Sequence, residues 1–150
     1  MATTLEATIP KRKTMIVMGA SQGIGASVTK AFLVGGYNLV ANAPEFTNWG
    51  FAPGETLALV EGNIGQASTA ARLAQTAVRA FGPIDRVVNN TGIFFKKPFI
   101  EYTVGEFRHL ADTNLGDYVS MTRPAGEIDG CSNDGWVHYC HPFCEVPWWG

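Results

Sequence analysis

The sequence predicts an α/β fold, in which a parallel sheet is covered by helices on both faces. Three observations lead to this class. Short apolar segments with strand character alternate with longer segments whose apolar residues recur at helical spacing. Glycine pairs and prolines separate these segments. The chain has 150 residues, of which 46% are hydrophobic and 16% are charged, the size and composition of one globular domain.

The first part of the chain is expected to form two strands around one helix. Residues 14–18 are an apolar strand, and residues 23–34 carry apolar positions at helical spacing up to the glycines 35–36. A second strand follows at residues 37–41. Residues 44–54 contain prolines and glycines and are expected to be a loop.

The next part repeats the alternation. Residues 56–60 are expected to form a third strand, and residues 67–81 an amphipathic helix that ends at Gly82-Pro83. Residues 84–88 read as a fourth strand, and helical spacing returns from residue 104 to about residue 121. Parallel strands joined by helical crossovers favour a sheet of about four strands in the order 3-2-1-4.

The chain divides into three segments. Residues 1–13 form an N-terminal extension that contains a small cationic cluster, residues 14–124 form the α/β domain, and residues 125–150 form an irregular tail. Neither helical nor alternating periodicity organises this tail.

A glycine-rich turn joins the first strand to the first helix. Gly19, Gly23 and Gly25 have the spacing of a turn that receives a pyrophosphate at a helix N-terminus. We expect Gly19 to make the tight turn, Gly23 to let the backbone approach the phosphates, and Gly25 to let helix and strand pack closely. The candidate phosphate-binding residues are Gly19, Ser21, Gln22, Gly23, Ile24 and Gly25.

Three motifs together resemble the short-chain dehydrogenase/reductase family over about residues 12–124. They are the glycine turn, Asn89-Asn90-Thr91-Gly92 after the fourth strand, and Asn114 in the following helix. The resemblance implies an incomplete Rossmann-like three-layer fold, NAD or NADP as cofactor, and hydride transfer between carbonyl and hydroxyl groups. It also places Asn90, Thr91 and Gly92 on the adenine side of the cofactor, with Thr91 replacing the usual alanine.

The resemblance leaves the choice between NAD and NADP open. Asn63, followed by Ile64, stands where the family usually has an acidic residue that touches adenine. A carboxylate near the end of the second strand would favour NAD, and an arginine there or in the glycine turn would favour NADP. This chain has Gln22 in the turn and Asn42 after the second strand, while Glu45 comes two or three residues late.

Catalysis in this family uses a tyrosine, a lysine four residues later, a serine and an asparagine. Asn114 matches the asparagine that anchors a proton-relaying water chain. None of the tyrosines is followed by lysine at the required spacing: Tyr37 pairs with Ala41, Tyr102 with Glu106, Tyr118 with Thr122 and Tyr139 with Phe143. We therefore expect an oxidoreductase by descent that is inactive alone. The alternative is a non-catalytic dinucleotide-binding or partner-binding module.

Two interpretations of residues 125–150 remain. A zinc site could use Cys131, His138, Cys140, His141 and Cys144. The spacing disfavours it, since there is no Cys-x-x-Cys and the histidine and cysteine pairs overlap. The preferred interpretation is an out-of-frame or alternatively spliced segment that is foreign to the family, so no metal site is expected.

Several properties of the whole chain follow. The net charge of −2 disfavours nucleic-acid binding. The absence of a long apolar run disfavours a membrane span, so a cytoplasmic protein is expected.

The fourth strand becomes an edge, and the helix near Phe107, Leu110, Leu115 and Val119 has an uncovered apolar face, which predicts association and low solubility. Lys96 and Lys97 are expected to be solvated, and Phe99 to pack.

Overall fold

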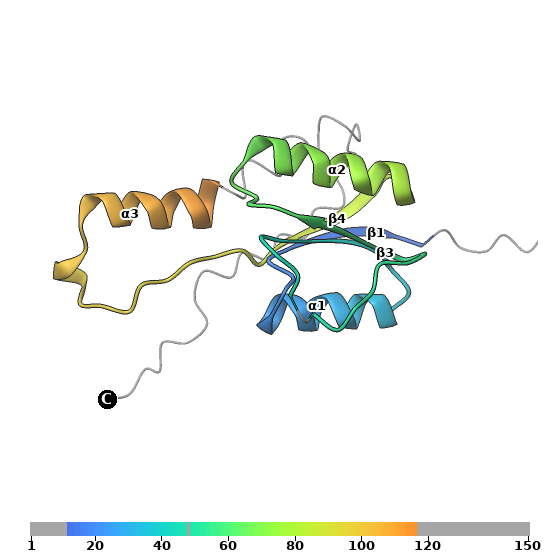
Figure 1. The fold of residues 1–150 in the computed structure, drawn as a ribbon, viewed down its shortest axis with the longest axis horizontal. Helices are drawn as coiled ribbons and strands as arrows, with labels where there is room; N and C mark the ends of the chain where they lie inside the picture. Colours follow the sequence, from blue (N-terminus) through green and yellow to red (C-terminus); the bar gives the residue numbers. More distant parts are fainter. Residues whose placement is uncertain (1–11, 48, 117–150) are drawn as a thin grey trace, which may run out of the picture.

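The structure is a computed structural model that describes residues 12–47 and 49–116. Within them a parallel sheet has the order β3-β2-β1-β4, and α1 and α2 cover its opposite faces (Figure 1). The elements are β1 (Thr14–Met18), α1 (Gly23–Val34), β2 (Asn38–Ala43), β3 (Leu57–Glu61), α2 (Ala67–Phe81) and β4 (Ile84–Asn89). The predicted fold class and strand order are confirmed.

Strand β1 is the centre of the fold. All five of its residues are buried, because it pairs with β2 on one side and with β4 on the other. Successive side chains point to opposite faces of a strand. Accordingly Ile16 and Met18 belong to the core under α2, whereas Met15 and Val17 belong to the core on the α1 face.

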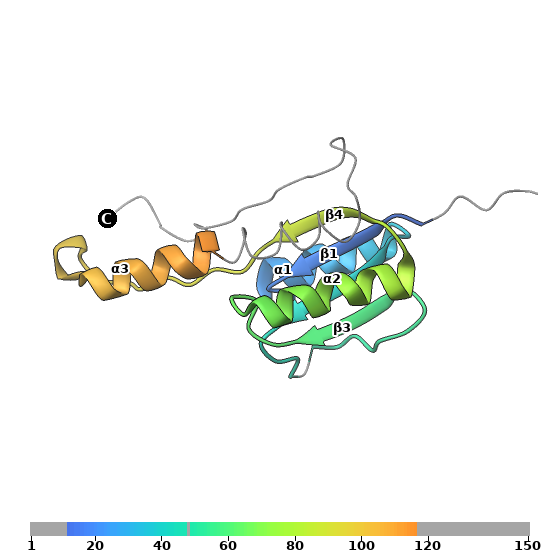
Figure 2. The ribbon, with the colours of Figure 1, turned by 90° about the horizontal axis from the view of Figure 1, so that it is seen from above.

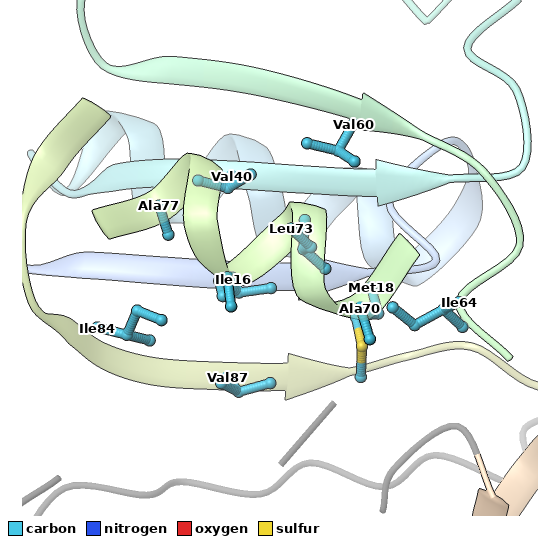
Figure 3. Packing of buried hydrophobic residues seen from close by; sticks show 11 residues of the cluster. Ile16, Met18, Val40, Val60, Ile64, Ala70, Leu73, Ala77, Ile84 and Val87 are labelled. Carbon is cyan, nitrogen blue, oxygen red and sulfur yellow. The ribbon is translucent and has the colours of Figure 1, made fainter. Parts of the chain in front are cut away.

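The core under α2 is shown in Figure 3. The helix buries Ala70, Leu73, Ala74 and Ala77 against the sheet. Three of these four residues are alanines, so the helix backbone lies close to the strands. Ile64, which is 2% exposed, closes the carboxyl end of this core.

The opposite face is covered partly by a loop. Residues 44–56 connect β2 to β3, and their described part contains no helix. Phe46, Trp49 and Phe51 pack instead with the apolar residues of the sheet on the face that α1 also covers. The ring centroid of Trp49 lies 4.5 Å from that of Phe46 and 4.8 Å from that of Phe51. The segment that carries these three packed rings, Phe46, Trp49 and Phe51, is called the aromatic loop below.

The strand bounds differ slightly from the prediction. Strand β2 runs two residues further than expected, to Ala43, and Tyr37 precedes it. The sequence pattern stops at Ala41 because asparagine is depleted in strands. Tertiary pairing overrides this preference, since Asn42 pairs with both Met18 of β1 and Val60 of β3.

Residues 90–116 form an arm that leaves the carboxyl end of β4. The arm contains η1 (Phe99–Glu101), α3 (Val104–Ala111) and the π-helical turn η2 (Asp112–Gly116). Figures 1 and 2 both show α3 set off to one side of the sheet. The expected helix is therefore α-helical only to Ala111, and its part beyond residue 116 lies outside the described residues.

Side-chain contacts hold α3 to residues 93–98 of the arm. Lys97 Nζ lies 2.6 Å from both Glu106 carboxylate oxygens, and the Phe95 and His109 rings stack with centroids 6.2 Å apart. The Tyr102 hydroxyl donates to the Phe95 carbonyl. The expectation that Lys97 is simply solvated is wrong, because it is paired, and the expectation that Phe99 packs is also wrong, because it is 85% exposed.

Residues 117–150 lie outside the described part of the chain, and so do the predictions made for Val119 and for the cysteines and histidines of the tail. Across residues 12–47 and 49–116, no helix has the length and apolar character needed to cross a membrane. The same residues contain no group of three potential metal ligands close together.

Candidate dinucleotide-binding site

The glycine turn lies between the carboxyl end of β1 and the start of α1. Gly19 has φ 70° and Gly23 has φ 55°. Side chains with a Cβ rarely adopt these conformations, so glycine is the residue that the turn requires. A Cβ on Gly23 would have no heavy atom within 4 Å, so the space beside it is open.

The turn packs directly against the residues that follow β4. Asn90 Nδ2 donates to the Gly19 carbonyl at 3.0 Å, and Asn90 N donates to the Met18 carbonyl at 3.1 Å. A Cβ on Gly19 would lie 2.9 Å from the Asn90 carbonyl, and one on Gly25 would lie 2.0 Å from the Gly19 carbonyl. Two motifs that are about seventy residues apart in the sequence therefore form one surface at the carboxyl edge of the sheet.

The N-terminus of α1 has unsatisfied donors. Gln22 occupies the N-cap position without a side-chain capping hydrogen bond, and the first turn contains no acidic residue. The first N–H groups of a helix have no partner within the helix, and the helix dipole adds positive potential there. Together with the open space at Gly23, this arrangement is suited to a phosphate group. Ile24, which is 45% exposed, adds an apolar side chain beside it.

The last residue of β4 and the turn that follows it contain two buried polar atoms that have no hydrogen-bond partner among the described residues. They are Asn89 Nδ2 and Thr91 Oγ1. The Asn89 side-chain oxygen accepts from Thr91 N at 3.1 Å, which fixes the turn. Buried polar atoms without partners are unusual in proteins, so these two atoms favour a polar ligand at this edge.

The two candidate residues near the end of β3 have different environments. Asn63 is exposed, and its side-chain oxygen accepts from Gly65 N at 2.9 Å. The Ile64 side chain is buried under α2, as Figure 3 shows, so only its backbone is available to a ligand. The apolar side chain of Ile64 and the polar side chain of Asn63 agree with these environments, although the sequence analysis assigned both residues to the cofactor.

The residues at the end of β2 do not decide between NAD and NADP, because the side chain there is the uncharged amide of Asn42. The Asn42 side chain is 1% exposed and donates to the carbonyls of Val60 and Gly62 at 2.8 and 3.1 Å. It therefore joins β2 to β3. Glu45 is exposed, and its carboxylate accepts from the Thr47 hydroxyl at 2.8 Å.

Asn114 has a structural role in the arm. Its side-chain oxygen accepts from Ile93 N at 2.9 Å, and its side-chain nitrogen donates to the Ile93 carbonyl at 3.1 Å. Both bonds go to one residue, just after the Asn89–Gly92 turn. Asn114 thus fixes the path of the chain where it leaves the candidate site, and the π-helical turn η2 presents it there.

Sequence reasoning missed the contribution of the aromatic loop to this site. Trp49 Nε1 donates to the Ala20 carbonyl within the glycine turn at 2.6 Å. Three aromatic residues within six positions of a loop are the only sequence signal for it.

A parallel α/β sheet whose glycine turn meets the N-terminus of a crossover helix defines the Rossmann-like class of folds. A family model described as short chain dehydrogenase matches residues 13–128. The chain belongs to the short-chain dehydrogenase/reductase family, whose members generally use NAD or NADP.

Individual relatives agree with this assignment. An uncharacterised oxidoreductase of Methylorubrum extorquens is 31% identical over 122 residues, which cover 77% of this chain and 49% of the relative. The 3beta-hydroxysteroid dehydrogenase 1 of Eggerthella lenta is 31% identical over 112 residues, covering 70% of this chain and 43% of the relative.

A solved structure is similar as well. The ligand-free aldohexose dehydrogenase of Thermoplasma acidophilum has a TM-score of 0.72 and 25% sequence identity, over 85% of this chain and 49% of that protein. The chain spans about half the length of these matched proteins.

Proposed function

We propose that this chain is the cofactor-holding half of a short-chain oxidoreductase and binds NAD or NADP at the carboxyl edge of β1 and β4. The observation that carries the proposal is the direct packing of the glycine turn on Asn90, beside an uncapped helix N-terminus. In this proposal Gly19, Ser21, Gln22, Gly23, Ile24 and Gly25 surround the phosphates. Asn63, the Ile64 backbone, Asn90, Thr91 and Gly92 face the adenosine.

We further propose that binding by these 150 residues does not lead to turnover. The bound cofactor would supply or accept a hydride. The proton at the substrate oxygen would need a tyrosine and lysine pair, and the printed sequence has no Tyr-x-x-x-Lys. Asn114 is the one family catalytic position that we assign, and its contacts support a role in fixing Ile93.

A second candidate function is a non-catalytic module that binds a partner protein. The observation in its favour is the arm, on which Phe99, Ile100, Val104 and Phe107 are 63% to 92% exposed. Exposed apolar clusters of this kind mark interaction surfaces. Under this alternative the small-molecule substrate would belong to a full-length relative that joins this chain.

The substitution Gly23→Ala tests the primary proposal. Alanine at φ 55° costs roughly 1–2 kcal/mol, and its methyl group would occupy the open space where we place the phosphates. We expect dinucleotide affinity to fall at least about tenfold, equivalent to ~1.4 kcal/mol. Isothermal titration of the 150-residue chain with NAD⁺, NADH, NADP⁺ and NADPH measures the affinity.

Gly36→Ala is the matched control. Gly36 has φ 82° and open space for a Cβ, but it lies at the far end of α1 from the glycine turn. It should lower the melting temperature as much as Gly23→Ala does and leave affinity unchanged. Equal losses of affinity in both variants, or no binding by the unaltered chain, would contradict the proposal.

A further inference from the structure

The aromatic loop reaches the glycine turn through one hydrogen bond. Trp49 is 9% exposed, and its indole N–H donates to the Ala20 carbonyl at 2.6 Å. Ala20 itself is fully buried, and its N–H donates to the Asn42 carbonyl at 2.9 Å. The peptide groups on both sides of Ala20 are therefore held by elements outside the turn.

Each held carbonyl fixes the direction of the next N–H group. A trans peptide unit is planar, so its N–H points opposite to its carbonyl. Asn90 holds the Gly19 carbonyl, and the Ala20 N–H on the same peptide points to β2. Trp49 holds the Ala20 carbonyl, so the Ser21 N–H must point away from the indole. Among the described residues this N–H has no acceptor.

The indole is itself held in place by packing. Phe46 and Phe51 flank its ring, and the Phe46 N–H donates to the Glu61 carboxylate at 3.0 Å, which ties the loop to the end of β3. The loop thus takes the place of a helical layer over β2 and β3 and also braces the turn. A turn that is fixed before binding loses less conformational entropy when the ligand arrives.

We propose that Trp49 is a positioning residue for the dinucleotide: through the Ala20 carbonyl it aims the Ser21 N–H and keeps the glycine turn in its binding conformation. This role rests on the proposed function. Trp49→Phe removes the N–H donor and keeps an aromatic ring in the cluster. We expect it to weaken NAD⁺ or NADP⁺ binding about fivefold, the effect of one net hydrogen bond.

The experiment compares Trp49→Phe with Phe81→Leu, which disturbs the core under α2 on the sheet face opposite to the aromatic loop. Titration calorimetry of the full 150-residue chain gives the dissociation constants, and amide hydrogen exchange of residues 19–25 without ligand reports the order of the turn. We expect faster exchange and weaker binding in Trp49→Phe alone, while Phe81→Leu changes only the melting temperature.

A second measurement needs no variant. The Trp49 indole N–H signal of the ¹⁵N-labelled chain should be protected from exchange and should shift when NAD⁺ is added. Unchanged affinity in Trp49→Phe, or an indole signal insensitive to a dinucleotide that does bind, would overturn this role and leave the proposed function standing. Failure of the unaltered chain to bind any of the dinucleotides would overturn both.

Discussion

Two threonine hydroxyls, Thr14 Oγ1 and Thr91 Oγ1, are buried without a hydrogen-bond partner among residues 12–47 and 49–116. Thr14 begins β1 at the amino edge of the sheet, whereas Thr91 follows β4 at the carboxyl edge, beside the glycine turn. An unsatisfied buried hydroxyl costs roughly 1–3 kcal/mol. The two positions therefore carry the same penalty, and only one of them lies where a ligand could remove it.

Substituting valine for Thr14 and for Thr91 tests which of the two hydroxyls contacts the ligand. Thr91→Val and Thr14→Val should each raise the free energy of unfolding of the ligand-free chain by about 1 kcal/mol, because each removes an unpaired polar atom. Thr91→Val should also weaken binding of NAD⁺, and Thr14→Val should not. Urea unfolding with and without NAD⁺ measures both effects, and a binding loss in Thr14→Val would argue against a ligand contact at Thr91.

Helix α3 begins at a group of hydrogen-bonded and charged side chains. Thr103 and Glu106 form a capping box at its N-terminus, and the Glu106 carboxylate also pairs with Lys97 at 2.6 Å. The Lys97 hydrogen bond, followed by those from Thr103, lowers the pKa of Glu106 from 4.5 to about 2. A lowered carboxyl pKa stabilises the folded state at high pH and ceases to do so at low pH.

The contribution of Glu106 should be complete above pH 4.5 and disappear as the pH falls through about 2. An NMR titration of the side-chain carboxyl should therefore give a midpoint near 2. Lys97→Gln should raise that midpoint toward the ordinary value, since it removes the largest cause of the shift. Glu101→Gln, in which the replaced carboxylate makes no hydrogen bond among the described residues, should leave it unchanged. If the midpoint stays near 2 in Lys97→Gln, the ion pair is absent in solution.

At the scale of the whole molecule, two features of the described residues bear on association. Strand β4 is an edge of the sheet, although Val87, Val88 and Asn89 on it are buried. The arm carries Phe107 and Leu115, each 63% exposed, and it lies apart from the sheet. Unpaired strand edges and apolar surfaces both promote association.

We expect the purified chain to self-associate or precipitate with rising concentration. Phe107→Lys should reduce this association, since it places a charge on the exposed face of α3. Val34→Lys is the control, because Val34 is 82% exposed at the end of α1, away from the arm. Light scattering coupled to size-exclusion chromatography measures the mass. A monodisperse monomer with a sharp, reversible melting transition would contradict the expectation.

Local patterns were sufficient for much of the fold. The bounds of α1 and α2 agree with the helical spacing and with the glycines that end them. The strand order followed from the alternation of elements, because parallel strands joined by right-handed crossovers have few arrangements. The glycine spacing also predicted the turn, since Gly19 and Gly23 adopt backbone conformations that other residues rarely take.

Long-range contacts decided the remainder. No local pattern shows that the Asn42 amide is bound to the carbonyls of Val60 and Gly62. Only the tertiary structure brings Asn90 to Gly19 and Trp49 to Ala20. The sequence by itself determined the family, the sheet and the glycine turn, because these depend on local periodicity and backbone freedom. The tertiary structure determined which side chains hold that turn, because hydrogen bonds between distant segments form only when the sheet brings them together.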